Sequence, residues 1–254
     1  MSKILHQFKC GHTTQCEYVK PDNKKTQNFT LVYAHGFCSD PFGRKPEEIK
    51  KWCEAHGVGF FRFEIAGHGS DSARFEQTTM DTYKSQIFEI VEELVDGPIV
   101  TAGASLGGWL ALLAGCQYPK KVLGIMGLAA APDFLKTYFE KFMKPEHKKI
   151  MDQYGKIEFP TNDFTYTITK QMIESAHDSL LLEKDEIPFR GKVRLLQGMK
   201  DASLEWHTVL TIAQKLISSD VQVCLMKDSN HHLSSDDDIE AIYRILDSFL
   251  VFCK

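Results

Sequence analysis

Six short apolar runs, each bounded by residues that favour turns, constrain the fold of this chain more than any other feature. Every run is too continuously apolar for a strand with one solvent-facing side, and such runs are typical of parallel strands buried on both faces. They span residues 29–34, 59–64, 98–104, 122–129, 193–198 and 221–226. We therefore expect a mostly parallel central sheet.

Stretches with helical periodicity lie between these runs, at residues 46–56, 78–96, 106–118, 204–218 and 237–252. Because strands and helices alternate, the predicted fold class is α/β, with right-handed crossovers and a sheet flanked by helices. The sequence contains no internal repeat and no linker-like tract, so we expect residues 1–254 to form a single domain.

Two segments break this alternation. Polar and apolar positions alternate over residues 4–19, which predicts an antiparallel hairpin at the sheet edge. Residues 133–190 carry helical patterns at 134–143 and 168–182, without a convincing strand. A helical insertion between two strands usually lies over the carboxyl edge of the sheet, where sites in α/β proteins open. We predict that residues 133–190 form a helical cap, and the alternative is a pair of extra surface helices.

The charge pattern argues against nucleic acid as a partner. The chain has 34 acidic and 30 basic side chains and a formal net charge of −4, and no stretch concentrates lysine and arginine. No segment approaches the ~18 apolar residues of a membrane span, and the first residues lack the uninterrupted apolar core of a signal peptide. We expect a cytoplasmic protein without a membrane span.

Seven cysteines are scattered without a repeated short spacing, which favours reduced thiols. Cys10, His12 and Cys16 could act as zinc ligands, but no second Cys/His pair lies nearby to complete a tetrahedral set. We interpret them as ordinary residues of the N-terminal hairpin, and predict no metal or organic cofactor.

The strongest local motif places a serine between a strand and a helix. Residues 103–107 read Gly-Ala-Ser-Leu-Gly, which fits G-x-S-x-G, between the apolar run 98–104 and the helical stretch 106–118. A nucleophile on such a turn is held in a strained conformation, so its neighbours two positions away must be small. The helix N-terminus then directs N–H groups at the oxyanion that forms on attack. The motif predicts that Ser105 is a nucleophile.

A serine nucleophile needs a base, and folds of this type supply the acid and then the histidine after the serine. Asp201 follows the run 193–198, and His231 follows the run 221–226, so both leave the carboxyl edge of the sheet. We predict His231 as the base and Asp201 as the carboxylate that orients it. The spacing leaves His232 open as an alternative base, and Asp133 and Asp228 as alternative acids.

The first strand ends in Ala-His-Gly-Phe at residues 34–37, where the second donor of an oxyanion hole is expected. We predict that the backbone N–H groups of Phe37 and Leu106 form this hole. His35 is interpreted as a structural residue that holds the loop. The glycine-rich residues 64–70 lack the ending of a phosphate-binding loop and are interpreted as a turn.

Taken together, these features resemble the α/β-hydrolase superfamily, from about residue 29 to the end of the chain. The similarity is greatest to a small cap-bearing group that includes palmitoyl-protein thioesterases, also described as acyl-glucuronide esterases. It rests on Ser-Leu-Gly-Gly-Trp at 105–109, on residues 194–201, on Trp-His-Thr at 206–208 and on Ser-Asn-His at 229–231.

The resemblance implies a catalytic serine, aspartate and histidine at Ser105, Asp201 and His231, and so favours His231 over His232. The chain departs from the group at Asn230, where an aspartate is usual, and at His232, where an arginine is usual. It implies a serine esterase or thioesterase that acts on small-molecule or acylated-protein substrates, with long-chain acyl thioesters such as palmitoyl-cysteine among them.

The predicted cap is rich in aromatic and aliphatic side chains, which indicates either an apolar roof for an acyl chain or simple packing of the cap onto the core. These side chains are Phe134, Leu135, Tyr138, Phe139, Phe142, Met143, Met172 and Ile173. Two other functions stay open at this point: carbon–carbon bond hydrolysis on the same fold, and a small-molecule binding protein without turnover. Epoxide opening is excluded because it needs a carboxylate nucleophile at position 105.

Overall fold

In the part of the chain that the structure describes, eight strands form one twisted sheet in the order β1-β2-β4-β3-β5-β6-β9-β10. The structure is a computed structural model that describes residues 3–22, 29–137, 140–141, 143–160 and 165–253. Strands β3 to β10 of this sheet pair in parallel. They are β3 (Thr30–Ala34), β4 (Gly59–Phe63), β5 (Ile99–Ala104), β6 (Val122–Leu128), β9 (Lys192–Gly198) and β10 (Val221–Met226).

The six apolar runs therefore all form strands, as the sequence predicted, and the fold class is α/β. Strands β3, β4 and β5 are buried along their whole length because helices cover both faces of the sheet. Strand β10 is only partly buried, since it lies at the edge of the sheet. The predicted N-terminal hairpin is also present: β1 (Ile4–Gln7) pairs antiparallel with β2 (Thr13–Val19) at the other edge.

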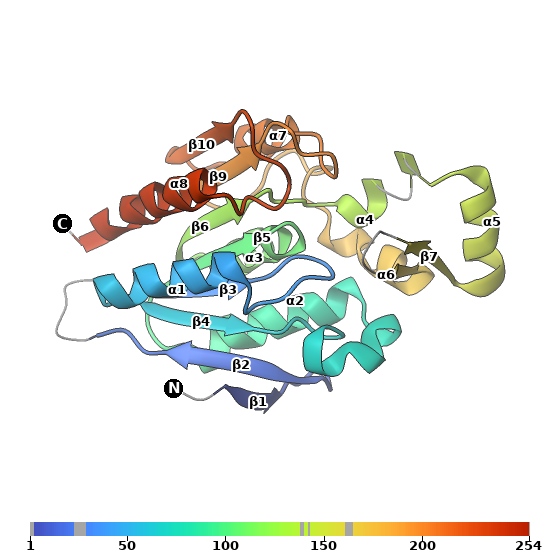
Figure 1. Ribbon diagram of the computed structural model, residues 1–254, viewed down its shortest axis with the longest axis horizontal. Helices are drawn as coiled ribbons and strands as arrows, with labels where there is room; N and C mark the ends of the chain where they lie inside the picture. The colour runs from blue at the N-terminus through green and yellow to red at the C-terminus, as the bar shows by residue number, and fades with distance from the viewer. Residues whose placement is uncertain (1–2, 23–28, 138–139, 142, 161–164, 254) are drawn as a thin grey trace.

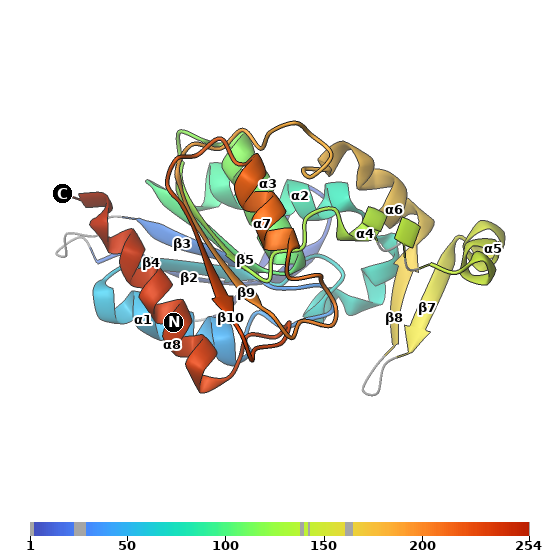
Figure 2. The same cartoon turned by 90° about the horizontal axis from the view of Figure 1, so that it is seen from above.

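Helices cover the two faces of the sheet, as Figures 1 and 2 show. One face is covered by α1 (Arg44–His56) and α8 (Asp236–Asp247), and the other by α2 (Met80–Glu89), α3 (Leu106–Gln117) and α7 (Thr208–Lys215). Three shorter helical segments extend two of these helices: η1 (Gly69–Gln77) precedes α2, the π-helical η2 (Ile90–Leu94) follows it, and η5 (Ser248–Cys253) follows α8. Each face buries its own apolar cluster.

The segment between β6 and β9 lies beyond the carboxyl ends of the parallel strands (Figure 1). It contains α4 (Phe134–Thr137), α5 (Pro145–Tyr154), β7 (Lys156–Pro160), β8 (Thr165–Thr169), α6 (Lys170–Ser175) and η4 (His177–Ser179). This is the place expected for a cap. Its extent over residues 133–190 and its role as a cap stay predictions.

The expectation that this segment has no strand is wrong. β7 and β8 pair antiparallel, with Ile157 opposite Ile168. The helical pattern assigned to 168–182 begins too early because Thr169 ends β8 and also caps α6: its side chain accepts a hydrogen bond from the Met172 N–H at 3.1 Å. Threonines occupy every second position of β8, and this short period-2 pattern was concealed by the helical spacing that follows it.

No helix in the described ranges is both long and apolar enough to cross a membrane.

Candidate active site

Ser105 lies at the junction between β5 and α3 in a backbone conformation that residues other than glycine rarely adopt. Its φ is 53° and its ψ is −115°, and such positive-φ residues store strain, typically at functional sites. A Cβ atom on Gly107 would lie 2.0 Å from the carbonyl oxygen of Ala34, and one on Gly103 would lie 2.2 Å from the backbone of Gly107. Small neighbours are therefore required for β5 and α3 to approach each other around the serine.

The loop after β3 packs directly against this serine. A Cβ atom on Gly36 would lie 3.4 Å from Ser105 Cβ and 3.4 Å from the carbonyl oxygen of Ala104. Among the residues that the structure describes, the backbone N–H groups of Phe37 and Leu106 donate to no acceptor. Two uncommitted donors thus lie on the two segments that meet at Ser105.

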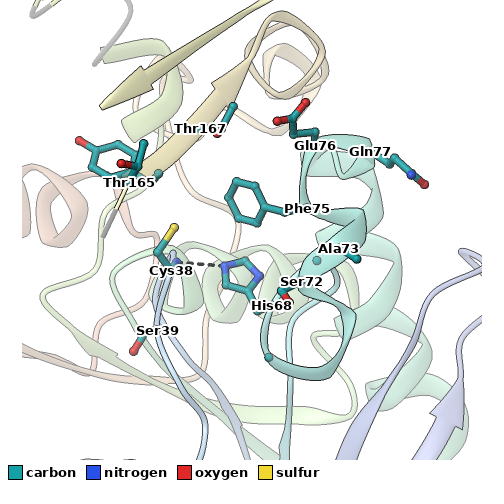
Figure 3. Close-up of a pocket in the computed structure, with 13 residues that line it drawn as sticks. Cys38, Ser39, His68, Ser72, Ala73, Phe75, Glu76, Gln77, Thr165 and Thr167 are labelled. Carbon is teal, nitrogen blue, oxygen red and sulfur yellow. Dashed lines mark hydrogen bonds between the residues drawn. The ribbon is translucent and has the colours of Figure 1, made fainter. Parts of the chain in front are cut away.

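Two buried histidines hold the Gly36–Cys38 loop in place. His35 Nε2 accepts a hydrogen bond from the Ile65 N–H at 2.9 Å, so its Nδ1–H donates to the Gly36 carbonyl oxygen at 2.8 Å. His68 Nε2 accepts from the Cys38 N–H at 3.0 Å (Figure 3), and its Nδ1 lies 3.0 Å from the Ala66 carbonyl oxygen. Both rings serve as acceptors, so both are neutral.

The structural role of His35 agrees with the sequence interpretation, whereas the role of His68 was missed. Its only signal was the Gly-His-Gly turn at 67–69, which gives no hint of the partner loop around Cys38. Burial, with the neighbouring His68, lowers the pKa of His35 to about 3. Burial also lowers the pKa of His68, although hydrogen bonds to Ala66 and Ile65 oppose the shift.

These neutral histidines predict a loss of stability in acid. Unfolded histidine takes up a proton below ~6.5, whereas folded His35 stays neutral down to a pKa of about 3. The contribution of neutral His35 to the free energy of unfolding is therefore complete above pH ~6.5. It falls as the pH drops towards 3, by up to ~1.4 kcal/mol per pH unit. We expect His35→Gln to lower the slope of the unfolding free energy against pH, between pH 4 and 6, by ~1.4 kcal/mol per pH unit. This corresponds to one proton taken up on unfolding.

Urea unfolding at several pH values measures this slope. His177→Gln is the matched control, since the His177 side chain is 78% exposed. An equal slope in the wild type and His35→Gln would exclude a buried neutral His35.

The Asp201 side chain is fully buried, and its carboxylate accepts hydrogen bonds from several donors, one of which is His231. Asp201 Oδ2 accepts from His231 Nδ1 at 2.7 Å and from Gln197 Nε2 at 2.9 Å, and Oδ1 accepts from the N–H groups of Ser203 at 2.8 Å and Leu204 at 2.9 Å. Burial alone would raise the pKa of Asp201, but His231, Leu204 and Gln197 together lower it. The ionised carboxylate keeps the proton of His231 on Nδ1 and leaves Nε2 free to accept one.

The alternative base, His232, has a different environment. Its backbone N–H donates to Asn230 Oδ1 at 2.9 Å, and in the described ranges no carboxylate contacts its ring. Of the two adjacent histidines, only His231 is paired with a carboxylate among the residues that the structure covers.

The alternative acids have other partners. Asp133 is buried and accepts from the N–H groups of Leu181 at 2.8 Å and Leu182 at 2.7 Å, so it fastens the two ends of the segment between β6 and β9 to each other. Asp228 is exposed and pairs with Lys200 at 2.6 Å. Neither contacts a histidine in the described part of the chain.

Ser105 and His231 line the same cavity of about 260 Å³, which also includes Phe37, Lys45 and His232. No hydrogen bond joins Ser105 and the His231 ring in the regions that the structure covers, a separation that is common in serine enzymes before substrate binds. The structure thus brings Ser105 and His231 to one cavity and pairs His231 with Asp201. The catalytic roles of these residues and of the Phe37 and Leu106 N–H groups stay predictions.

A larger cavity of about 800 Å³ adjoins this one and shares Cys38 and Ser39 with it. Figure 3 shows the Phe75 ring pointing into it, opposite Thr165 and Thr167 of β8. Tyr166 completes this wall.

Five of the eight side chains that the sequence offered for an apolar roof lie in the described residues, and none of these five lines the larger cavity. Leu135, Met143 and Met172 are buried in the core cluster, and Phe134 and Ile173 pack against it. These five side chains attach the segment to the core instead. The other three, Tyr138, Phe139 and Phe142, lie outside the described residues.

The N-terminal zinc alternative finds no support. His12 Nδ1 pairs with Asp71 Oδ2 at 2.5 Å in a buried contact. In the described residues no group of three or more histidine, cysteine, aspartate or glutamate side chains is placed to hold a metal ion.

The chain is similar to known proteins over most of its length. A model of the family described as "Serine aminopeptidase, S33" matches residues 26–233. The protein named "Palmitoyl-protein thioesterase ABHD10, mitochondrial" from Bos taurus is 31% identical over 252 residues, which cover 95% of this chain and 82% of the bovine protein. The protein of the same name from Homo sapiens is 32% identical over 223 residues, covering 87% of this chain and 72% of the human one.

Solved structures show the same likeness. Alpha/beta hydrolase domain-containing protein 10 from mouse has a TM-score of 0.86 at 26% sequence identity, over 98% of each chain. Est1E from Butyrivibrio proteoclasticus has a TM-score of 0.78 over 96% of each chain, at 18% identity.

Proposed function

This chain belongs to the serine aminopeptidase S33 family and is an α/β-hydrolase serine hydrolase, and on that premise we propose that it cleaves ester or thioester bonds of acylated substrates. Long-chain acyl thioesters such as palmitoyl-cysteine are the substrates we propose, since the relatives from Bos taurus and Homo sapiens are named palmitoyl-protein thioesterases. The observation that carries the proposal is the pairing of buried Asp201 with His231, which lines one cavity with Ser105.

In the proposed mechanism, His231 Nε2 takes the proton of Ser105 as its Oγ attacks the acyl carbonyl carbon. The N–H groups of Phe37 and Leu106 donate to the oxyanion, and Asp201 stabilises the positively charged imidazolium. The carbon–sulfur or carbon–oxygen bond then breaks, and the leaving group takes the proton from His231. Water repeats the sequence on the acyl-enzyme and releases the acid. The hydroxyl, imidazole and amide groups supply every step.

We propose the larger cavity as the site of the acyl chain. It adjoins the cavity that Ser105 lines, and Phe75 and Tyr166 give it an aromatic wall. The Phe37 ring lines the smaller cavity and contacts two rings that line the larger one. Its centroid lies 5.4 Å from that of Phe75 and 6.2 Å from that of Tyr166. A volume of about 800 Å³ is enough for a long acyl chain.

The test is hydrolysis of p-nitrophenyl esters and acyl thioesters of increasing chain length. We expect turnover with a preference for long chains, because each buried CH₂ contributes about 0.8 kcal/mol. Ala73 lines the larger cavity, so Ala73→Trp should fill it and shift the preference towards shorter chains. Ala55→Trp, at an exposed position of α1, is the matched control.

A chain-length profile that Ala73→Trp leaves unchanged would remove the larger cavity from the proposal. If the wild type turned over none of these substrates, the proposed reaction itself would be wrong.

The cytoplasmic location stays a prediction of the sequence. The relatives found are named as mitochondrial proteins.

A further inference from the structure

The strand that leads to Asp201 carries a buried amide where the strand pattern favours an apolar side chain. Gln197 is the penultimate residue of β9 and is fully buried. Because side chains alternate along a strand, it shares a face of the sheet with Val193 and Leu195, which belong to one apolar cluster. Burying an amide costs free energy unless its hydrogen bonds are made, so packing alone does not explain a glutamine at this position.

The hydrogen bonds of Gln197 are made at one end of its amide. Nε2 donates to Asp201 Oδ2 at 2.9 Å and to the Gly198 carbonyl oxygen at 3.1 Å. Oε1 is buried, and among the residues that the structure describes it accepts from no donor. Turning the amide over would place Oε1 against the Asp201 carboxylate, so repulsion between oxygens also fixes its orientation. A buried acceptor without a partner lowers stability, so we attribute the amide to its contact with Asp201.

This contact is made to the carboxylate oxygen that faces the proposed base. Asp201 Oδ2 accepts from Gln197 and, at 2.7 Å, from His231 Nδ1. Oδ1 accepts instead from the N–H groups of Ser203 and Leu204. Gln197 lies in β9 itself, whereas the other three donors lie in loops. The Gln197 amide therefore ties Oδ2 to the rigid sheet, and a group fixed to a strand is placed more precisely than one fixed to a loop.

From this arrangement we infer that Gln197 is a positioning residue for the proposed reaction, whose amide holds Asp201 Oδ2 towards His231 while its buried Oε1 lowers the stability of the fold. The inference rests on the proposed function, because it concerns the same pair of side chains. Gln197 lines neither of the two cavities and acts through Asp201. The rate of the reaction should therefore depend on the amide, whereas the stability of the fold should not.

Gln197→Met tests both parts of the inference, since it roughly keeps the volume of the side chain and removes the amide. We expect kcat for ester hydrolysis to fall by at least ~10-fold, as for loss of a hydrogen bond to a charged group. KM should change by less than about twofold, because Gln197 lies outside both cavities. The melting temperature should rise, or fall by less than ~4 °C, since the buried Oε1 is removed together with Nε2.

Gln222→Met is the matched control, at an exposed glutamine of the neighbouring strand β10. It should behave as the wild type in steady-state kinetics and in thermal unfolding. A smaller loss of kcat in Gln197→Met than expected would overturn the inference. A larger fall in its melting temperature, or a failure to fold, would overturn it as well, because the amide would then serve the fold.

Gln197→Glu restores a donor at this position when the new carboxyl group is protonated. Two carboxyl groups that share a buried site raise the pKa of one of them, so the new group should hold its proton at pH 6 beside the Asp201 carboxylate. Its O–H then replaces Nε2, and kcat at pH 6 should be at least about threefold higher than that of Gln197→Met. His231 and Asp201 titrate in both variants, so the comparison is made at one pH. Equal rates in the two variants would contradict a role for the donor.

The proton between His231 Nδ1 and Asp201 tests the positioning without any turnover. It should give a downfield proton resonance in the unliganded protein, identified by its absence from His231→Gln. We expect this proton to exchange with water at least ~10-fold faster in Gln197→Met than in the wild type or Gln222→Met, because Oδ2 has lost a donor. An unchanged exchange rate would contradict the inference whatever the activity. Faster exchange in a protein that hydrolyses no ester would instead support the positioning and reject the proposed reaction.

Discussion

Ser105→Ala lowers kcat/KM for ester and thioester hydrolysis by at least ~10³-fold, because no other group can form the acyl-enzyme. The variant should remain folded, since the change removes only the hydroxyl from a side chain that lines a cavity. Rates for the wild type and the variant with one ester and one thioester measure the loss. Labelling by a fluorophosphonate probe should disappear in parallel.

Ser85→Ala, at an exposed position of α2, is the matched control and should behave as the wild type. Turnover that survives Ser105→Ala unchanged would assign the reaction to another nucleophile. Labelling of the wild type without any hydrolysis would instead point to a binding protein that has kept a reactive serine.

His231→Gln lowers kcat by at least ~10³-fold, whereas the same substitution at the adjacent His232 changes it by less than about 10-fold. The difference follows from the hydrogen bonds: Asp201 holds the His231 ring at 2.7 Å, and in the described ranges no carboxylate contacts the ring of His232. Two neighbouring residues with identical substitutions provide a control for local disturbance of the loop.

Rates at saturating substrate and thermal unfolding of both variants make the comparison. An equal loss in the two variants would mean that the loop is disturbed as a whole, and a larger loss at His232 would move the base to that residue.

The central sheet was predictable because its strands are buried on both faces, so that residues such as those of 99–104 are apolar or small at nearly every position. The hairpin of β7 and β8 was not, since it is short, partly exposed and followed at once by a helix that begins at Lys170. In such segments the contacts with the rest of the molecule decide between strand and helix, and spacing alone does not reveal them.

The candidate site likewise contains residues that the sequence predicted and residues that it did not. The order of Ser105, Asp201 and His231 along the chain is a property of the sequence, and each residue follows a recognisable strand. His68 has no such signal, because its role depends on a contact with Cys38, 30 residues away.

The topology around β6 and β9 has a consequence for how this protein can diversify. The two strands are hydrogen-bonded neighbours, with Ile125 opposite Val193, so the long segment between them leaves and re-enters the sheet at adjacent points. A segment of different length or sequence could replace it without altering the register of any strand pair, and loop closure would add only ~0.6 kcal/mol for each doubling of its length. Strand β8, which supplies Thr165 and Tyr166 to the larger cavity, is thus exchangeable, while Ser105, Asp201 and His231 stay at the ends of strands outside that segment. Grafting a segment from another hydrolase between these two strands is therefore a direct route to new acyl-chain preferences.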